Sequence, residues 1–250
     1  MRAADLAAAL ALLVGCARAA PALAAASQYA IVFDGGSTGT RVYVYRYTPS
    51  ADPTALPALY AERSWNMKVK PGLSTFADNP DAVKNGYMQP LLDFAARLVP
   101  AEQQRSAVLL LRATAGMRLV SAAAASRIYD NLFEAVRAHG AFSASRADFG
   151  TLSGEDEGVF GWLSVNQLML QAHKISAAQL GTVGALDLGG GSTQITFATG
   201  PKAAAAAAVA AAPLPGRAVP VFTRSHLGFG NKQAATISPD LAPDLARPPF

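Results

Sequence analysis

The sequence predicts an α/β fold, and three observations lead to this prediction. Residues 107–111 form a continuous apolar run, which is typical of a strand buried on both faces of a sheet. Helical apolar spacing follows at residues 121–138 and again beyond residue 158. An apolar strand, an aspartate, a glycine turn and a second strand occur twice in the same order, at residues 31–45 and 185–197. Two like units far apart in the chain indicate the two halves of a clamp.

Residues 29–98 are expected to form a hairpin, a short third strand, a loop and a helix. Alternating apolar and aromatic residues predict strands, which we place at residues 29–33, 41–47 and 58–63. Residues 66–80 have the proline, glycine and asparagine content of a surface loop. A helix is expected from about residue 81 to residue 98, kinked or divided at Pro90 because proline lacks the backbone donor.

The apolar run at residues 107–111 is expected to bring the segment 112–118 to the carboxyl end of a strand, where α/β sheets place ligand contacts. The following helix, residues 121–138, has a stop signal in Gly140. A second helix is expected to carry the apolar residues between Val159 and Met169.

The chain is expected to divide into a leader, residues 1–26, a first domain, residues 27–178, and the start of a second domain, residues 179–250. Within the second domain, the alanine-rich residues 201–216 are expected to be a low-complexity insertion on a loop. A further strand is expected at residues 219–224, and the proline-rich end does not have the pattern of a completed domain.

The leader has the composition of a secretory signal peptide: a short basic start, an Ala/Leu run and several small-residue cleavage options. It is short for a bilayer span, and Arg18 interrupts it. An alanine-rich disordered leader and a lipoprotein signal ending at Cys16 are the alternatives. We expect the secretory pathway, either the Golgi or ER lumen or the extracellular space, and leave membrane association through the leader open.

Composition narrows the range of partners. The net charge is +4 in 250 residues, and no basic stripe with interleaved aromatics occurs, so nucleic-acid binding is not expected. The three histidines, His139, His173 and His226, share no ligand spacing, so a zinc site is not expected either. Trp162 lies on an apolar helical stripe and is expected in the core.

Four segments carry the side chains that phosphoryl transfer to water requires, namely phosphate-holding groups, a metal site, an oriented water and a base. They are residues 34–41, 113–118, 153–162 and 187–194. Their order and their residues resemble the four conserved regions at the start of the apyrase family, the nucleoside di- and triphosphate diphosphohydrolases. The resemblance covers about residues 29 to 232.

The resemblance implies an actin-like fold of two RNase-H-type domains, the second truncated at the end of this chain, which hydrolyses terminal phosphates of nucleoside tri- and diphosphates. Glu157 would be the general base, aided by Ser192 and Gln194, and Thr114 would face the terminal phosphate. Asp34 and Asp187 would hold Mg²⁺ or Ca²⁺ through water. Phosphate oxygens would be bound by the two turns, through Gly35, Gly36, Ser37, Thr38, Gly39, Thr40, Gly189, Gly190, Gly191 and Ser192.

The residues alone leave alternatives open. Glu157 is expected at the start of a helix, where the helix dipole would keep its carboxylate ionised and able to accept a proton. Glu155 and Asp156 lie beside it and compete for the role of base. Arg112 and Arg118 fit either phosphate contact or structural ion pairs. The rival functions are an exopolyphosphatase-like hydrolase and an inactive, truncated nucleotide-binding paralogue. The sequence does not indicate the oligomeric state.

Overall fold

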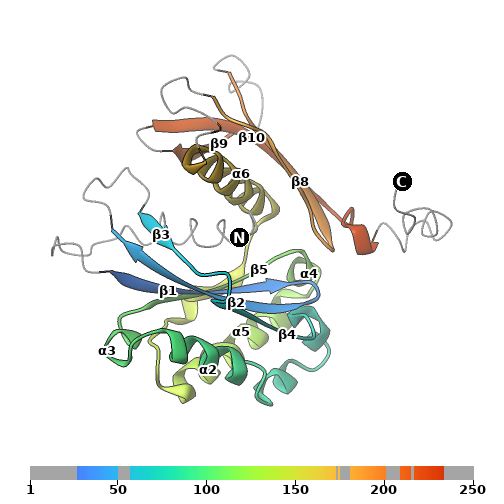
Figure 1. Ribbon diagram of the computed structural model, residues 1–250. Coiled ribbons are helices and arrows are strands. Elements are labelled where there is room, and N and C mark those ends of the chain that lie inside the picture. Colours follow the sequence, from blue (N-terminus) through green and yellow to red (C-terminus); the bar gives the residue numbers. More distant parts are fainter. Residues whose placement is uncertain are drawn as a thin grey trace, which may run out of the picture.

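The computed structural model describes residues 27–49, 57–172, 174, 181–200, 209–214 and 217–233. The expected leader and His173 lie outside these residues. The described chain forms two bodies, each built on a β-sheet, and the segment before helix α6 joins them (Figure 1). None of the helices in the described part of the chain has the length and apolar content needed to cross a bilayer.

The first body contains a six-stranded sheet in which β3, β2, β1, β5 and β6 lie in that order and β4 pairs with β2. Strands β1 and β2 form the expected antiparallel hairpin, and β5 and β6 extend the sheet in parallel from β1. The strands are β1 (Gln28–Gly36), β2 (Gly39–Thr48), β3 (Ala58–Tyr60), β4 (Asn66–Val69), β5 (Val108–Ala113) and β6 (Phe149–Thr151).

One face of this sheet packs against helices to form the main core. Its helices are η1 (Leu73–Phe76), η2 (Pro80–Lys84), α2 (Gln89–Leu98), α3 (Ala101–Gln104), α4 (Ala115–Arg118), α5 (Ala122–His139) and η3 (Arg146–Asp148). Helix α5 agrees with the sequence prediction: the side chain of Ser121 accepts a bond from the N–H of Ala124, and Gly140 ends the helix at φ 78°. On the opposite face, alternate β2 tyrosines form a smaller buried cluster with Val32 and Leu110.

The second body contains an antiparallel four-stranded sheet in the order β7, β8, β10, β9. Its elements are β7 (Ala185–Leu188), β8 (Ser192–Ala198), β9 (Val209–Leu214), β10 (Arg217–Leu227) and the helix α6 (Gly154–Gln171). Helix α6 lies across one face of this sheet (Figure 1). Trp162 is fully buried there and packs with Val159, Leu163 and the β10 residues Val219 and Val221. The predicted core position of Trp162 is thus confirmed.

The packing of α6 differs from the expected division at residue 178. The helix was placed in the first domain because it precedes the second glycine turn in sequence, but its apolar side chains pack on the second sheet. Two close approaches allow this contact: a Cβ on Gly158 would lie 2.7 Å from Thr196 Oγ1, and a Cβ on Gly154 would collide with Ser225.

Three local predictions were wrong, wholly or in part. The expected loop at residues 66–80 contains strand β4 and the 3₁₀ helix η1. The helix expected from residue 81 is divided, which was one of the two expected outcomes, but its first part, residues 80–84, is a 3₁₀ helix. Pro90 lies in the first turn of α2, where its missing donor costs nothing. In the alanine-rich segment, Val209–Leu214 form strand β9 and pair with β10 because a neighbouring strand supplies their hydrogen bonds. Residues 201–208 lie outside the described chain.

Candidate active site

The two glycine turns face one another across a cleft between the bodies. The first turn joins β1 to β2 through Ser37 and Thr38, and the second joins β7 to β8 through residues 189–191. They approach so closely that a Cβ on Gly190 would collide with Ser37 Oγ, and a Cβ on Gly191 would lie 2.9 Å from the Cβ of Ala115. Glycine is therefore required at both positions because the second turn packs closely against the first turn and the start of helix α4.

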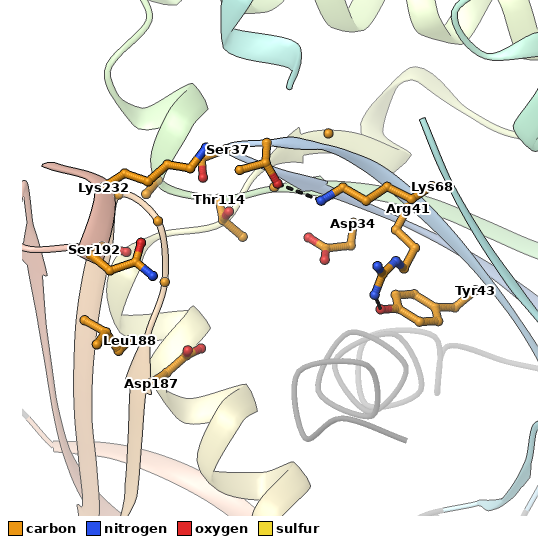
Figure 2. A pocket seen from close by; sticks show the side chains of 18 residues that line it. Asp34, Ser37, Arg41, Tyr43, Lys68, Thr114, Asp187, Leu188, Ser192 and Lys232 are labelled. Atoms are coloured by element: carbon orange, nitrogen blue, oxygen red, sulfur yellow. Dashed lines mark hydrogen bonds between the residues drawn. The ribbon is translucent and has the colours of Figure 1, made fainter. Parts of the chain in front are cut away.

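The cleft has a volume of about 340 Å³ (Figure 2). It is lined by Asp34, Gly36, Ser37, Thr38, Gly39, Arg41, Tyr43, Lys68, Thr114, Ala115, Asp187, Leu188, Gly189, Gly190, Gly191, Ser192, Asn231 and Lys232. Both predicted metal-binding aspartates, Thr114 and most residues of the two predicted turns are thus gathered in one place. The central expectation, that the two turns converge, agrees with this geometry.

Gly35 and Thr40 do not line the cleft, although both were predicted to bind phosphate. These two residues are paired across the hairpin, and both are buried. Gly35 packs against Ala113 and Leu73, and Thr40 accepts a 2.9 Å hydrogen bond from Tyr87. Side chains alternate between the two faces of a hairpin. The cross-strand pair Asp34 and Arg41 therefore faces the cleft, whereas the next pair, Gly35 and Thr40, faces the core.

The second turn is held from behind by the segment that follows β10. The N–H groups of Gly228, Asn231 and Lys232 donate to the carbonyl oxygens of Gly191, Gly189 and Gly190, at 2.9, 3.0 and 3.2 Å. Thr193 Oγ1 adds a 2.6 Å bond to the carbonyl of Phe229. These bonds fix the turn before any ligand arrives, which lowers the ordering cost of binding.

Glu157 lies behind the cleft at the centre of a polar network. Its Oε2 atom accepts hydrogen bonds from Arg118 Nη2 at 2.7 Å and from Gln194 Nε2 at 3.2 Å. Arg118 Nη2 also donates to Ser192 Oγ at 2.9 Å, and Gln194 Nε2 lies 2.8 Å from the same oxygen. Ser192 belongs both to this network and to the cleft wall, so it connects the two.

Burial sets the electrostatics of the two central carboxyl groups. Desolvation raises the pKa of Glu157, Arg118 opposes this shift, and the charges of Asp187 and Asp34 add to it. From the sequence, the helix dipole was expected to keep Glu157 ionised. That expectation left out desolvation, which has the larger effect on the pKa of Glu157. Desolvation also raises the pKa of Asp187, because burial disfavours its charged form. A nearby cation would stabilise the charged carboxylate.

The competing carboxylates lie elsewhere. Glu155 and Asp156 are exposed, and Asp156 accepts a 2.8 Å bond from Ser153 at the start of α6. Arg112 donates to the backbone carbonyls of Leu111 and Asp148, which is a structural role. Arg118, in contrast, contacts Glu157 and Ser192 in the polar network.

Three cations in the cleft wall were missed. Arg41 ends the first predicted motif and donates to the hydroxyl of Tyr43 at 3.1 Å. Lys68, on β4, and Lys232, after β10, come from segments that were expected to be loops or were left undecided. Isolated lysines carry no spacing signal, so only the fold could bring them to the cleft.

Comparison with known proteins identifies the family to which this cleft belongs. The model of the GDA1/CD39 (nucleoside phosphatase) family matches residues 22–239. The chain belongs to this family. The resemblance drawn from the four motifs is thereby confirmed.

Members of the GDA1/CD39 family that resemble the chain come from distant organisms. The nucleoside diphosphate phosphatase ENTPD5 of Homo sapiens is 39% identical over 177 residues, covering 70% of this chain and 39% of the relative. Ectonucleoside triphosphate diphosphohydrolase 5 of Gallus gallus is 36% identical, covering 82% and 47%. The Golgi apyrase of Saccharomyces cerevisiae is 32% identical, covering 68% and 30%. The chain thus spans less than half the length of these relatives.

The fold is similar to that of a nucleoside triphosphate hydrolase from Neospora caninum, with a TM-score of 0.58 at 19% identity. The match covers 83% of this chain and 46% of the solved chain. It supports the mixed α/β architecture of a GDA1/CD39 protein.

Proposed function

We propose that the chain supplies the phosphate-binding cleft and hydrolytic centre of an apyrase-type enzyme, which removes terminal phosphates from nucleoside tri- and diphosphates with a divalent cation. The observation that carries the proposal is the network that joins Glu157 to Ser192 on the wall of a cleft built by both glycine turns. The names of the relatives, which are apyrases and nucleotide phosphatases, support the same reaction.

Glu157 is the proposed general base. Within the described residues both of its hydrogen bonds go to Oε2 and none goes to Oε1, which leaves Oε1 for a water molecule. The water oxygen forms a bond to the terminal phosphorus, its proton passes to Glu157, and the bond from phosphorus to the bridging oxygen breaks. Burial raises the pKa of Glu157, which favours proton transfer to it, and Arg118 acts in the opposite direction and lowers this pKa.

Ser192 and Gln194 are proposed to orient this water, and Thr114 to contact the terminal phosphate. Ser192 Oγ and Gln194 Nε2 are 2.8 Å apart and lie beside the carboxylate of Glu157, so both could bond to the same water. Thr114 follows strand β5 directly, and it lines the cleft together with Ser192 (Figure 2). Phosphate oxygens are assigned to the cleft-facing residues of the two turns, Gly36, Ser37, Thr38, Gly39, Gly189, Gly190, Gly191 and Ser192.

Asp34 and Asp187 fit a divalent cation. Hard oxygen donors suit Mg²⁺ and Ca²⁺, and a partly buried Asp187 with a raised pKa gains from the positive charge. In the described chain, no three histidine, cysteine, aspartate or glutamate side chains gather closely enough to hold a metal by themselves. Water therefore completes the proposed coordination, and the bound cation would neutralise charge on the phosphate oxygens.

Two further features belong to this proposal. The architecture is assigned to the actin-like class, in which two related domains close on a nucleotide, with support from the paired turns. The secretory pathway is the proposed compartment, on the grounds of the signal-like composition of residues 1–26 and the Golgi apyrases among the relatives.

Phosphate release from a panel of nucleoside di- and triphosphates, with and without a chelator, tests the function. We expect release that stops with the chelator and returns with Mg²⁺ or Ca²⁺. Long-chain polyphosphate is the comparison substrate: its hydrolysis without nucleotide hydrolysis would favour an exopolyphosphatase. Nucleotide binding without any release would favour a non-hydrolysing paralogue.

A further inference from the structure

Two lysines from different bodies converge on the rim of the cleft. Lys68 comes from β4 of the first sheet, and Lys232 follows β10 of the second. In Figure 2 their side chains extend toward the Ser37–Thr38 turn from opposite sides. Asp187 lies at the other end of the cleft, with Thr114 and Ser192 in between (Figure 2).

Each lysine is tied to a glycine turn. Lys68 Nζ donates a 2.6 Å hydrogen bond to Thr38 Oγ1, and its Cε atom lies 2.8 Å from the position that a Cβ of Gly39 would take. The backbone N–H of Lys232 donates to the carbonyl of Gly190, and its Cδ atom lies 3.6 Å from the corresponding position on Gly190. The Lys68 ammonium is therefore held at the first turn, and the Lys232 side chain starts at the second turn and extends toward Ser37 (Figure 2).

Lys68 and Lys232, together with Arg41, bring positive charge to the wall of the cleft. In the described part of the chain, neither Lys68 nor Lys232 has a carboxylate within ion-pair distance. Burial lowers the pKa of Lys68, as do the charges of Arg41, Lys70 and Lys232, while Asp34 acts in the opposite direction. Like charges that converge in this way repel one another until an anion binds between them.

We propose that Lys68 and Lys232 bind one phosphate group of the substrate between them, and that this bridge joins the two bodies and selects ligands with at least two phosphates. The inference rests on the proposed function, which places the reacting phosphate beside Ser192 and Glu157. The phosphate bound by the lysines is a different one, because the network around Glu157 contains neither lysine. The proposal therefore assigns the two positions to two phosphate groups of one ligand.

Isothermal titration of imidodiphosphate, a non-hydrolysable pyrophosphate analogue, in the presence of Mg²⁺ tests the proposal without catalysis. The variants are Lys68→Met, Lys232→Met and the double variant. Lys70→Met is the matched control, because Lys70 is exposed two residues from Lys68 and does not line the cleft. All the substituted side chains are exposed, so the thermal midpoints should stay equal, which separates binding from folding.

Each single substitution should weaken imidodiphosphate binding about tenfold, as expected for the loss of one hydrogen bond to a charged group. The double variant should lose less than the product of the two single effects, because both lysines hold the same phosphate.

Three results would overturn the bridge. The first is an effect of Lys68→Met or Lys232→Met no larger than that of Lys70→Met, and the second is strict additivity. The third is failure of the unsubstituted chain to bind imidodiphosphate. Nucleotide hydrolysis that persists with any of these results would leave the proposed function standing, whereas loss of both binding and hydrolysis would remove the two proposals together.

Discussion

Arg118 Nη2 lies 2.7 Å from Glu157 Oε2, and this contact joins the first body to the second. Both side chains are largely buried, at 13% and 18% exposure, so the pair is shielded from solvent. Arg118 lowers the pKa of Glu157 against the stronger effect of burial. The arginine therefore adjusts the basicity of the proposed base as well as its position.

Arg118→Gln should move the acid limb of the rate profile to higher pH. Removing the cation leaves burial and the charges of Asp34 and Asp187 to raise the pKa of Glu157 further, so the carboxylate protonates at a higher pH and loses its function as a base there. The pH dependence of kcat for nucleotide hydrolysis measures this shift. Arg112→Gln is the control and should keep the profile of the parent, because Arg112 bonds to backbone carbonyls away from the network. A profile that moves equally in both variants would contradict the assignment.

Glu157→Gln should lower turnover by roughly 10²–10⁴ while the affinity for a non-hydrolysable nucleotide stays within about threefold. The amide keeps the shape of the side chain but cannot accept the proton. Steady-state kinetics and titration calorimetry measure the two effects. Glu155→Gln, an exposed neighbour on the same helix turn, should change turnover by less than about twofold. Equal losses in the two variants would place the base elsewhere.

Asp187→Asn should weaken Mn²⁺ binding, measured by electron paramagnetic resonance as a stand-in for Mg²⁺, by at least about tenfold. The substitution removes the negative charge of a partly buried carboxylate, and this charge is what would attract the cation. Asp156→Asn, which changes an exposed carboxylate outside the cleft, provides the control. Unchanged Mn²⁺ affinity in Asp187→Asn would remove this residue from the proposed cation site.

Two glycines of α6 should respond in opposite ways to alanine. A Cβ on Gly158 would meet Thr223 and Thr196 on the second sheet, so Gly158→Ala should lower the free energy of unfolding by about 1–3 kcal/mol. Gly161 has open space around its Cβ position, and Gly161→Ala should raise that free energy by about 0.5–1 kcal/mol because alanine favours a helix. Chemical denaturation measures both, and stabilisation by Gly158→Ala would show that the helix does not pack as described.

The sequence predicted those parts of the fold whose signals are local. Strands β1, β2 and β5 and helix α5 follow from periodicity and caps, and the paired motifs indicated the converging turns. Three matters required tertiary information. The alanines of β9 have no strand preference of their own and pair because β10 lies beside them. The apolar residues of helix α6 could have packed on either sheet, and only the structure shows that they pack on the second. Lys68 and Lys232 belong to no sequence motif that would have predicted their place in the cleft.

The errors inside the first motif have a simpler cause. Residues 34–41 were taken as a block, but a hairpin points alternate cross-strand pairs to opposite faces. Asp34 and Arg41 face the cleft together, while Gly35 and Thr40 support it from the core. Period-two reasoning applied to the motif would have removed these two residues from the list of phosphate contacts.

The attachment of α6 to the second sheet also bears on how the molecule works. Glu157, Ser192 and Gln194 are all carried by the α6 body, whereas Arg118 and the Ser37–Thr38 turn belong to the other. A rotation about the short link at Leu152 and Ser153 would leave the first three in register with one another and break only their bonds to Arg118. If Glu157 is the base, opening of the two bodies would therefore stop hydrolysis while the three proposed catalytic residues keep their arrangement.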